Sequence, residues 1–247
     1  HIYAVETGLS SDPSMNWRIP ELDGVSIVSF SDAHSLPKLG RELTVFDGEL
    51  SYQGLMDSLK NQNIAYTIEF FSEEGKYHYS GHRKCGISYS PADVESHGRS
   101  CPVCGRRLTL GVMQRVDELA VREVNTWRDS EGFVRADNGR PPFKSLVALQ
   151  QIVAESMGKG VNTKGVQAEY FRLVGEFGSE ISILMDTPLS GIEGVSGERI
   201  ADGISRVRRG DVLIEPGYDG LYGTVKIWSD ESSKMAPAHQ AQIMLDG

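Results

Sequence analysis

The chain has 247 residues, 39% of them apolar, which fits one large or two to three small globular domains and excludes a disordered chain. A net charge of −9 argues against a protein that coats nucleic acid non-specifically, because such binding needs many lysines and arginines. The sequence has no signal-peptide pattern and no apolar run of about 18 residues, and its few cysteines suit a reducing compartment, so we expect a cytoplasmic protein without a membrane partner.

Two short apolar runs, residues 2–5 and 25–30, predict buried strands. Each ends in polar residues, which is typical of the carboxyl edge of an α/β sheet or barrel, where loops carry the chemistry. After the second run, Asp32 and His34 form a D-x-H pattern that offers a carboxylate oxygen and an imidazole to one cation, such as Zn, Mn or Fe. An aspartate that caps a helix, followed by a surface histidine, would produce the same letters, so both interpretations stay open.

A helix is expected within residues 50–59, where apolar residues recur at helical spacing. Residues 64–71 and 76–79 flank a turn at 72–75 and predict a β-hairpin that leads into the next motif.

All three cysteines lie in two mirrored knuckles, H-x2-C-G at 82–86 and C-x2-C-G at 101–105. A two-residue spacer lets each pair of ligands converge on one ion, and the glycine that follows permits the turn to close. The pattern predicts a structural Zn²⁺ in a ribbon of short strands, and its four ligands are His82, Cys85, Cys101 and Cys104.

Two other histidines, His78 and His97, compete with His82 as the fourth ligand, but only His82 repeats the spacing of the other pair. Buried free thiols or a disulfide would leave the clustering unexplained. Residues 76–107 carry six basic against two acidic side chains, which makes this module a candidate for phosphate contacts, although a solvated face would have the same charges. The candidate contacts are Arg83, Lys84, Arg106 and Arg107.

Three further helices are expected at residues 112–125, 143–157 and 161–175. Residues 189–204 approximate a helix-hairpin-helix, whose turn at Gly194 and Gly197 would offer backbone N–H groups to a DNA phosphate. A plain helix capped by Ser196 fits the same residues. The chain contains no P-loop or dinucleotide fingerprint, so we expect no nucleotide cofactor.

Five motifs in this order resemble endonuclease Q, a family whose members are often labelled helicase-like. The motifs are E-T-G-L-S-S-D-P-S-M-N-W-R at 6–18, S-D-A-H-S at 31–35, G-H-R-K-C-G at 81–86, C-P-V-C-G at 101–105 and P-G-Y-D-G at 216–220. The resemblance covers nearly the whole chain and rests on the combination of motifs.

The resemblance implies a PHP-type metallohydrolase that nicks DNA on the 5′ side of deaminated bases or abasic sites. Asp32 and His34 match the last metal-binding motif of the PHP domain, which uses catalytic Zn²⁺, Mn²⁺ or Mg²⁺. The resemblance implies three regions in chain order, namely an α/β region, a zinc ribbon and a mainly α-helical C-terminal region. Residues 1–62 would be the end of the PHP-type barrel, 63–110 the zinc module, 111–185 a helical domain, and 186–247 the helix-hairpin-helix-like segment with a short β or loop tail.

PHP sites also use an H-x-H motif, which this sequence lacks; His1 stands alone and would equally suit the remnant of a tag. We therefore expect a C-terminal fragment with an incomplete catalytic cluster. The loop at residues 10–17, beside Asp32, is our candidate for part of the pocket that receives an extruded nucleotide. Alternatively, this loop has only a structural role, and Trp17 is buried in it. Its candidate substrate contacts are Ser10, Ser11, Asn16 and Trp17.

Two other functions compete with a damage-specific endonuclease. One is a non-catalytic zinc-ribbon module that binds nucleic acid, with the D-x-H pattern incidental. The other is a PHP-type phosphatase of a small phosphate ester, which the zinc module and the basic cluster disfavour, because such an enzyme needs no surface of DNA size.

Overall fold

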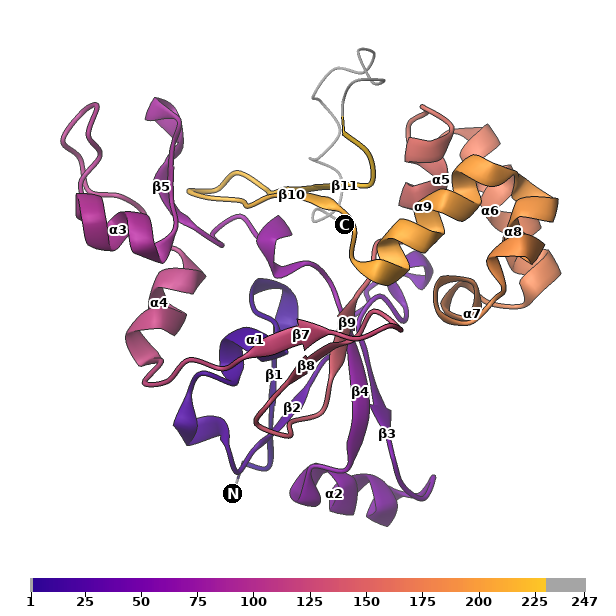
Figure 1. Ribbon diagram of the computed structural model, residues 1–247, viewed down its shortest axis with the longest axis horizontal. Helices are drawn as coiled ribbons and strands as arrows, with labels where there is room; N and C mark the ends of the chain where they lie inside the picture. Colours follow the sequence, from indigo (N-terminus) through magenta and orange to yellow (C-terminus); the bar gives the residue numbers. More distant parts are fainter. Residues whose placement is uncertain (1, 230–247) are drawn as a thin grey trace. The chain divides into compact units, whose positions relative to one another are not determined.

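The computed structural model describes residues 2–229, which fall into two compact units (Figure 1). The first comprises the residues up to Asp129, Phe133–Ser145 and Ile214–Thr224, and the second comprises Ser130–Gly132, Leu146–Leu213 and the residues from Val225. His1 and the tail after residue 229 lie outside the described residues. The expected division into four domains stays a prediction.

The first unit is a mixed α/β structure with three sheets. Strands β1 (Ala4–Glu6) and β2 (Ser26–Val28) pair in parallel. A five-stranded sheet has the order β3-β4-β9-β8-β7, in which β4 and β9 are parallel and the other neighbours antiparallel. Its strands are β3 (Leu43–Phe46), β4 (Ile64–Glu69), β7 (Thr126–Arg128), β8 (Val134–Ala136) and β9 (Phe143–Ser145).

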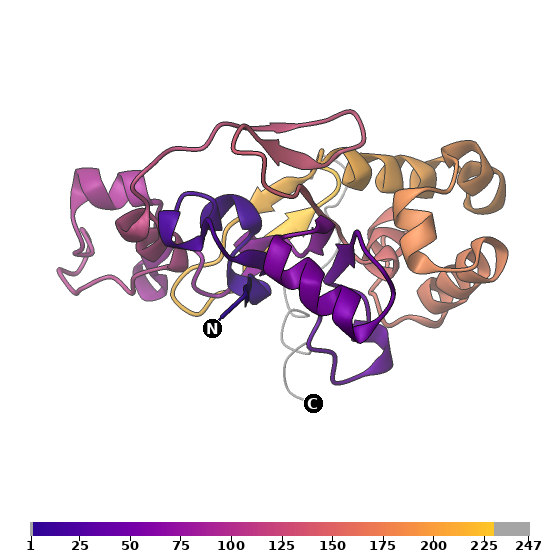
Figure 2. The ribbon, with the colours of Figure 1, turned by 90° about the horizontal axis from the view of Figure 1, so that it is seen from below.

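The third sheet is a small hairpin of β5 (Ser80–His82) and β6 (Ile87–Tyr89). Helices α3 (Pro91–His97) and α4 (Val112–Leu119) lie side by side next to it in both views (Figures 1 and 2). The other helices of this unit are α1 (Pro13–Asn16) and α2 (Tyr52–Asn61), with single turns η1 (Gly8–Ser10), η2 (Pro20–Leu22), η3 (Leu36–Lys38), η4 (Ser72–Glu74) and η5 (Arg83–Cys85).

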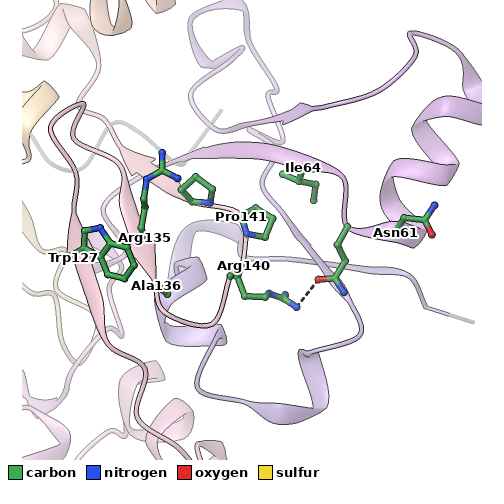
Figure 3. Close-up of a pocket in the computed structure, with 10 residues that line it drawn as sticks. Asn61, Ile64, Trp127, Arg135, Ala136, Arg140 and Pro141 are labelled. Atoms are coloured by element: carbon green, nitrogen blue, oxygen red, sulfur yellow. Dashed lines mark hydrogen bonds between the residues drawn. The ribbon is translucent and has the colours of Figure 1, made fainter.

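The first unit has a core where β1 and β2 meet the five-stranded sheet. Trp17 is 2% exposed and meets the ring of Phe143 edge to face, with 5.6 Å between ring centroids. Ile27 and Ala136 complete this buried cluster. At the rim of the same unit, the end of α2 and strands β7 and β8 border a groove (Figure 3).

The second unit is a bundle of five helices, shown in pink and orange in Figures 1 and 2. They are α5 (Leu149–Ser156), α6 (Lys164–Phe177), α7 (Glu180–Met185), α8 (Leu189–Ser196) and α9 (Glu198–Arg209). Each contributes at least one apolar side chain that is fully buried, among them Leu149, Leu173, Ile183, Ile192 and Ile204. Strands β10 (Leu213–Glu215) and β11 (Thr224–Lys226) lie where the chain passes between the units.

The α/β class and the helical region near the C-terminus are confirmed, whereas the PHP-type barrel and the ribbon architecture stay predictions. Helices predicted at 50–59, 112–125 and 161–175 are present as α2, α4 and α6, although α4 ends early, at Leu119. Every helix within residues 2–229 is too short or too polar to cross a lipid bilayer.

Two predicted elements were wrong. Residues 64–71 do not form a hairpin with 76–79, because β4 pairs instead with β3 and β9 in the middle of a sheet. Residues 143–147 do not begin a helix but form the buried strand β9 and the extended segment after it, and α5 starts only at Leu149. A proline pair fits the first turn of a helix and the start of a strand equally well, so the periodicity alone did not separate them.

Candidate functional site

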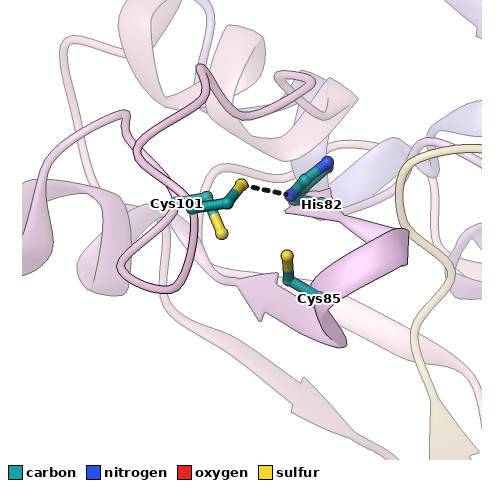
Figure 4. A group of neighbouring side chains, drawn as sticks. His82, Cys85 and Cys101 are labelled. Carbon is teal, nitrogen blue, oxygen red and sulfur yellow. Dashed lines mark hydrogen bonds between the residues drawn. The ribbon is translucent and has the colours of Figure 1, made fainter.

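The two knuckles come together, as the spacing predicted. His82 ends β5, Cys85 ends η5, and Cys101 and Cys104 lie in the loop after α3. Their ligand atoms all lie within 4.8 Å of one another, and within residues 2–229 no other group of three or more such side chains is this close. Figure 4 shows the side chains of His82, Cys85 and Cys101 turned towards a common centre.

Tight local turns hold these ligands. Gly86 has φ 67° and Gly105 has φ 72°, left-handed conformations that glycine adopts without a steric penalty. The Gly105 N–H donates to the Cys101 carbonyl at 2.8 Å, and the Cys101 N–H donates to the Arg106 carbonyl at 2.7 Å. These turns and hydrogen bonds are local to each knuckle.

The electrostatics of the cluster favour a thiolate. The Cys104 sulfur lies 3.3 Å from His82 Nδ1. Burial raises the pKa of the Cys101 thiol and the hydrogen bond from His82 lowers it, and the net pKa falls to about 6. Burial and the two neighbouring thiols raise the pKa of Cys85 to about 11. Three thiols and an imidazole around one centre are a soft donor set that fits a metal ion.

Residues 216–223, a loop of the first unit that is distant in sequence, form hydrogen bonds to this module. The Asp219 carboxylate accepts from the Arg83 N–H at 2.7 Å and from Thr109 Oγ1 at 2.6 Å. The Gly217 carbonyl accepts from the Tyr79 N–H at 2.9 Å. The sequence marked residues 216–220 only as a motif of the resemblance, and nothing local to Asp219 indicated which residues it would bind.

The predicted phosphate contacts are all on the surface. Arg83, Lys84, Arg106 and Arg107 are exposed, and none of the four forms an ion pair within the described part of the chain. Their charges are therefore available to a polyanion, as the phosphate prediction requires.

The other predicted DNA contacts, Gly194 and Gly197, lie in the second unit and are also exposed. Gly197, with φ 83°, is the single residue between α8 and α9, which pack against each other. Ser196 ends α8 and does not cap α9, so the cap in the alternative prediction was wrong, although the helix after it is present and buries Ile200 and Ile204.

The loop after β1 is compact and mostly polar. Asp12 caps α1 by accepting from the Met15 N–H at 2.9 Å, and Asn16 Nδ2 donates to Ser11 Oγ at 3.1 Å. Ser10 is exposed, and Ser11 and Asn16 are partly exposed. Trp17 is different, because its indole is buried in the core and has no free face for a substrate. The burial of Trp17 therefore favours a structural role for this residue over a role as a substrate contact.

Asp32 and His34 follow β2 as predicted and are both exposed. Asp32 has φ 44°, and its carbonyl lies 2.8 Å from His34 Nδ1, so the two residues form one tight turn. Within residues 2–229 no third histidine, cysteine or carboxylate completes a metal-binding group with them. Their role as metal ligands stays a prediction.

A buried glutamate near these loops was missed by the sequence analysis. Glu69, at the end of β4, is 1% exposed and accepts hydrogen bonds from Thr7 Oγ1 at 2.8 Å and from Ser29 Oγ at 3.0 Å. Thr67 Oγ1 donates to its other oxygen. Thr7 precedes the polar loop and Ser29 precedes Asp32, so one carboxyl group ties both segments to the sheet. A glutamate inside the apolar run 64–71 was the available signal.

Burial raises the pKa of Glu69 to about 8, against the lowering effect of its three hydroxyl partners. Between pH 4.5 and about 8 the folded chain keeps this proton while the unfolded chain releases it, so stability falls as pH rises through this window. We expect a loss of roughly 2–4 kcal/mol between about pH 5 and about pH 8.5, measured by urea unfolding.

Glu69→Gln is expected to reduce this dependence, because the amide stays neutral at every pH, and to leave the part that comes from Glu42 and Glu74, whose pKa values burial raises to about 7. Glu42→Gln is the matched control. Burial raises the pKa of Glu42 to about 7, so that variant should lose only the lower part of the slope. Parallel curves for the parent chain and Glu69→Gln would show that Glu69 does not hold its proton in the folded state.

Comparison with known proteins gives two kinds of match. The model of the MJ0043 C-terminal domain family matches residues 148–211. The uncharacterized protein MJ0043 of Methanocaldococcus jannaschii is 30% identical over 229 residues, which cover 90% of this chain and 28% of that protein. The uncharacterized protein YqxK of Bacillus subtilis is 29% identical over 230 residues, which cover 91% of this chain and 53% of that protein.

Two solved structures are similar at 31% identity. One is the lesion-specific endonuclease PfuEndoQ from Pyrococcus furiosus, with a TM-score of 0.76 over 90% of this chain and 54% of that one. The other is endonuclease Q in complex with a 27-mer duplex substrate with an abasic lesion at the active site. It has a TM-score of 0.72 over 93% of this chain and 56% of that one. The chain therefore spans about half the length of the endonuclease Q structures that it matches.

Proposed function

We propose, on the premise that this chain resembles endonuclease Q over nine tenths of its length, that it is part of a metal-dependent DNA endonuclease acting at damaged nucleotides. The observation that carries the proposal is the match to an endonuclease Q solved on a duplex with an abasic lesion. Deaminated bases and abasic sites are the proposed targets, with cleavage on their 5′ side.

We assign a structural Zn²⁺ to the His82, Cys85, Cys101 and Cys104 cluster. Zinc takes four tetrahedral N and S ligands at about 2.0–2.3 Å, which sets neighbouring ligand atoms about 3.3–3.8 Å apart. Ligand atoms that already lie within 4.8 Å of one another need only a small contraction to reach this geometry. Four protein ligands leave no open position, so the site stabilises the module and performs no chemistry.

For the catalytic cluster we propose Asp32 and His34 as two of several ligands. Bound Zn²⁺, Mn²⁺ or Mg²⁺ would polarise the scissile phosphate and lower the pKa of an attacking water. The turn that joins the Asp32 carbonyl to His34 Nδ1 fixes the imidazole orientation and leaves the Asp32 carboxylate exposed. Glu69 positions this segment through Ser29.

A lesion-specific enzyme has to reach a base or sugar that pairing and stacking normally cover, so the damaged nucleotide is extruded from the helix. The polar loop with Ser10, Ser11 and Asn16 is our candidate for part of the receiving pocket. Its hydroxyl and amide groups suit the hydrogen-bonding edge of a base, and the Thr7 bond to Glu69 holds the loop at the same sheet edge as Asp32.

DNA binding by the chain itself tests the proposal. We expect the 247-residue chain to bind a 27-mer duplex with one abasic site more tightly than the intact duplex, measured by fluorescence anisotropy over a range of salt concentrations. Failure to bind either duplex would contradict the proposal.

The double variant Arg106→Ala/Arg107→Ala should weaken binding to both duplexes and reduce the slope of log K against log salt by roughly 2, since each arginine displaces about one counterion. Arg172→Ala is the matched control, because this arginine lies in the second unit and is paired with Glu169 at 2.7 Å. An unchanged salt slope in the double variant would remove these two arginines from the DNA surface.

A further inference from the structure

The groove at the rim of the first unit is unusual in its lining. It has a volume of about 570 Å³ and is bordered by ten residues from the end of α2, from the start of β4, from β7 and β8, and from the segment before β9. Figure 3 draws Trp127 and Arg135 on the hairpin at one side of the groove and Asn61, at the end of α2, at the other. None of the ten residues is acidic, although the whole chain carries a net charge of −9.

Trp127 presents a free aromatic face to this groove. It lies on β7, the last strand of its sheet, and its side chain is 50% exposed. The other tryptophans are engaged elsewhere: Trp17 is 2% exposed, and the Trp228 ring lies 3.6 Å from the Arg199 guanidinium while its Nε1 donates to Asp202 at 2.9 Å. Half of the Trp127 side chain is therefore open to a ligand.

Two arginines, Arg135 and Arg140, line the groove together with the Trp127 indole. Arg135 is the cross-strand partner of Trp127, and its guanidinium forms an ion pair of 2.6 Å with Asp129. Arg140 also lines the groove and donates to neutral oxygens, namely the carbonyls of Leu22, Asp23 and Val25 and the side-chain amide of Gln62. These four bonds hold the Arg140 guanidinium in place.

We propose that this groove binds a strand of unpaired nucleotides, with one base stacked on Trp127 and the adjoining phosphate near Arg135 and Arg140. An aromatic face in a groove that two arginines also line, with no acidic residue among the ten lining residues, is complementary to a base and its phosphate. The strand is unpaired because a paired base offers only its edges, whereas stacking on an indole needs the face of the base. The inference rests on the proposed function, since an endonuclease that extrudes a nucleotide must also hold the strand that it opens.

The intrinsic fluorescence of Trp127 tests this directly. An oligothymidylate of about 12 nucleotides should quench the fluorescence of the parent chain, because a stacked base quenches indole emission and Trp17 is buried. Trp127→Phe should abolish the quenching while retaining binding, because phenylalanine keeps a stacking face. Trp127→Ala should weaken binding about tenfold, which corresponds to the loss of one stacked base.

Trp228→Phe is the matched control and should leave the quenching intact. An edge-strand residue that is half exposed tolerates replacement, and an unchanged melting temperature will show that the variants fold. Undiminished quenching in Trp127→Phe, or unchanged affinity in Trp127→Ala, would overturn the inference.

The outcomes also separate this inference from the proposed function. If the parent chain binds the abasic duplex but not the oligothymidylate, the groove assignment fails and the proposed function stands. If it binds neither, both fail.

Discussion

Replacing Cys104 by serine is expected to release the metal and to unfold the module from Ser80 to Thr109 while both units otherwise stay folded. Its strands β5 and β6 have three residues each, and few of its apolar side chains are buried, chiefly Val94 and Leu108. So small a core does not offset the entropy of ordering about 30 residues. Structural zinc contributes on the order of 10 kcal/mol to domains of this kind, so the loss of one thiolate ligand removes most of their stability.

Metal analysis and limited proteolysis measure this effect. The parent chain should hold about one zinc per molecule, and Cys104→Ser should hold close to none and be cut within the module. Exhaustive chelation of the parent chain should produce the same cleavage pattern.

His97→Ala is the matched control for the ligand assignment. His97 was a competitor of His82 in the sequence, but it is exposed, bonds to the Asp93 carbonyl at 3.0 Å, and lies outside the four-ligand group. We expect His97→Ala to retain its zinc and His82→Ala to lose it. The reverse result would assign the fourth ligand to His97.

The metal cluster was predictable because its information is local. The two-residue spacers and the glycines after Cys85 and Cys104 fix each knuckle within five residues, so the sequence defines the ligands without knowledge of the fold. Asp32 and His34 were proposed from an equally local pattern after a predicted strand, and the structure confirms only that they follow β2, not that they bind a metal. Only the approach of one knuckle to the other depends on the rest of the structure.

The sheet was not predictable in this way, because strand pairing is not local. β4 pairs with β9 across more than 70 residues, and the run that forms β9 has the same apolar pattern as the start of a helix. Glu69 and Asp219 were missed for a related reason. Their partners, such as Thr7 and Thr109, lie 62 and 110 residues away and become neighbours only through the fold.

In the whole protein, Asp32→Ala is expected to abolish nicking of a duplex that contains one uracil or abasic site, in the presence of Mn²⁺ or Mg²⁺. A cation bound by several ligands loses a hard oxygen and a negative charge, so we expect the rate to fall at least about a thousandfold, roughly 4 kcal/mol of barrier. Binding should change little, because the proposed DNA contacts of the metal module lie on other segments. The measurement is single-turnover nicking together with anisotropy on the same duplex.

Two controls make this result specific. Asp47→Ala removes another exposed loop aspartate that has no proposed role, and it should nick at the parent rate. Asp32→Asn keeps a side chain that tolerates the left-handed backbone at φ 44°, so loss of nicking in Asp32→Asn as well assigns the effect to the missing charge and not to a distorted turn. The 247-residue chain alone should bind but not nick, because Asp32 and His34 form no complete metal group within its described residues. If this chain alone nicks DNA, the prediction that its catalytic cluster is incomplete is wrong. If the Asp32→Ala variant of the whole protein nicks at the parent rate, Asp32 has no role in the mechanism.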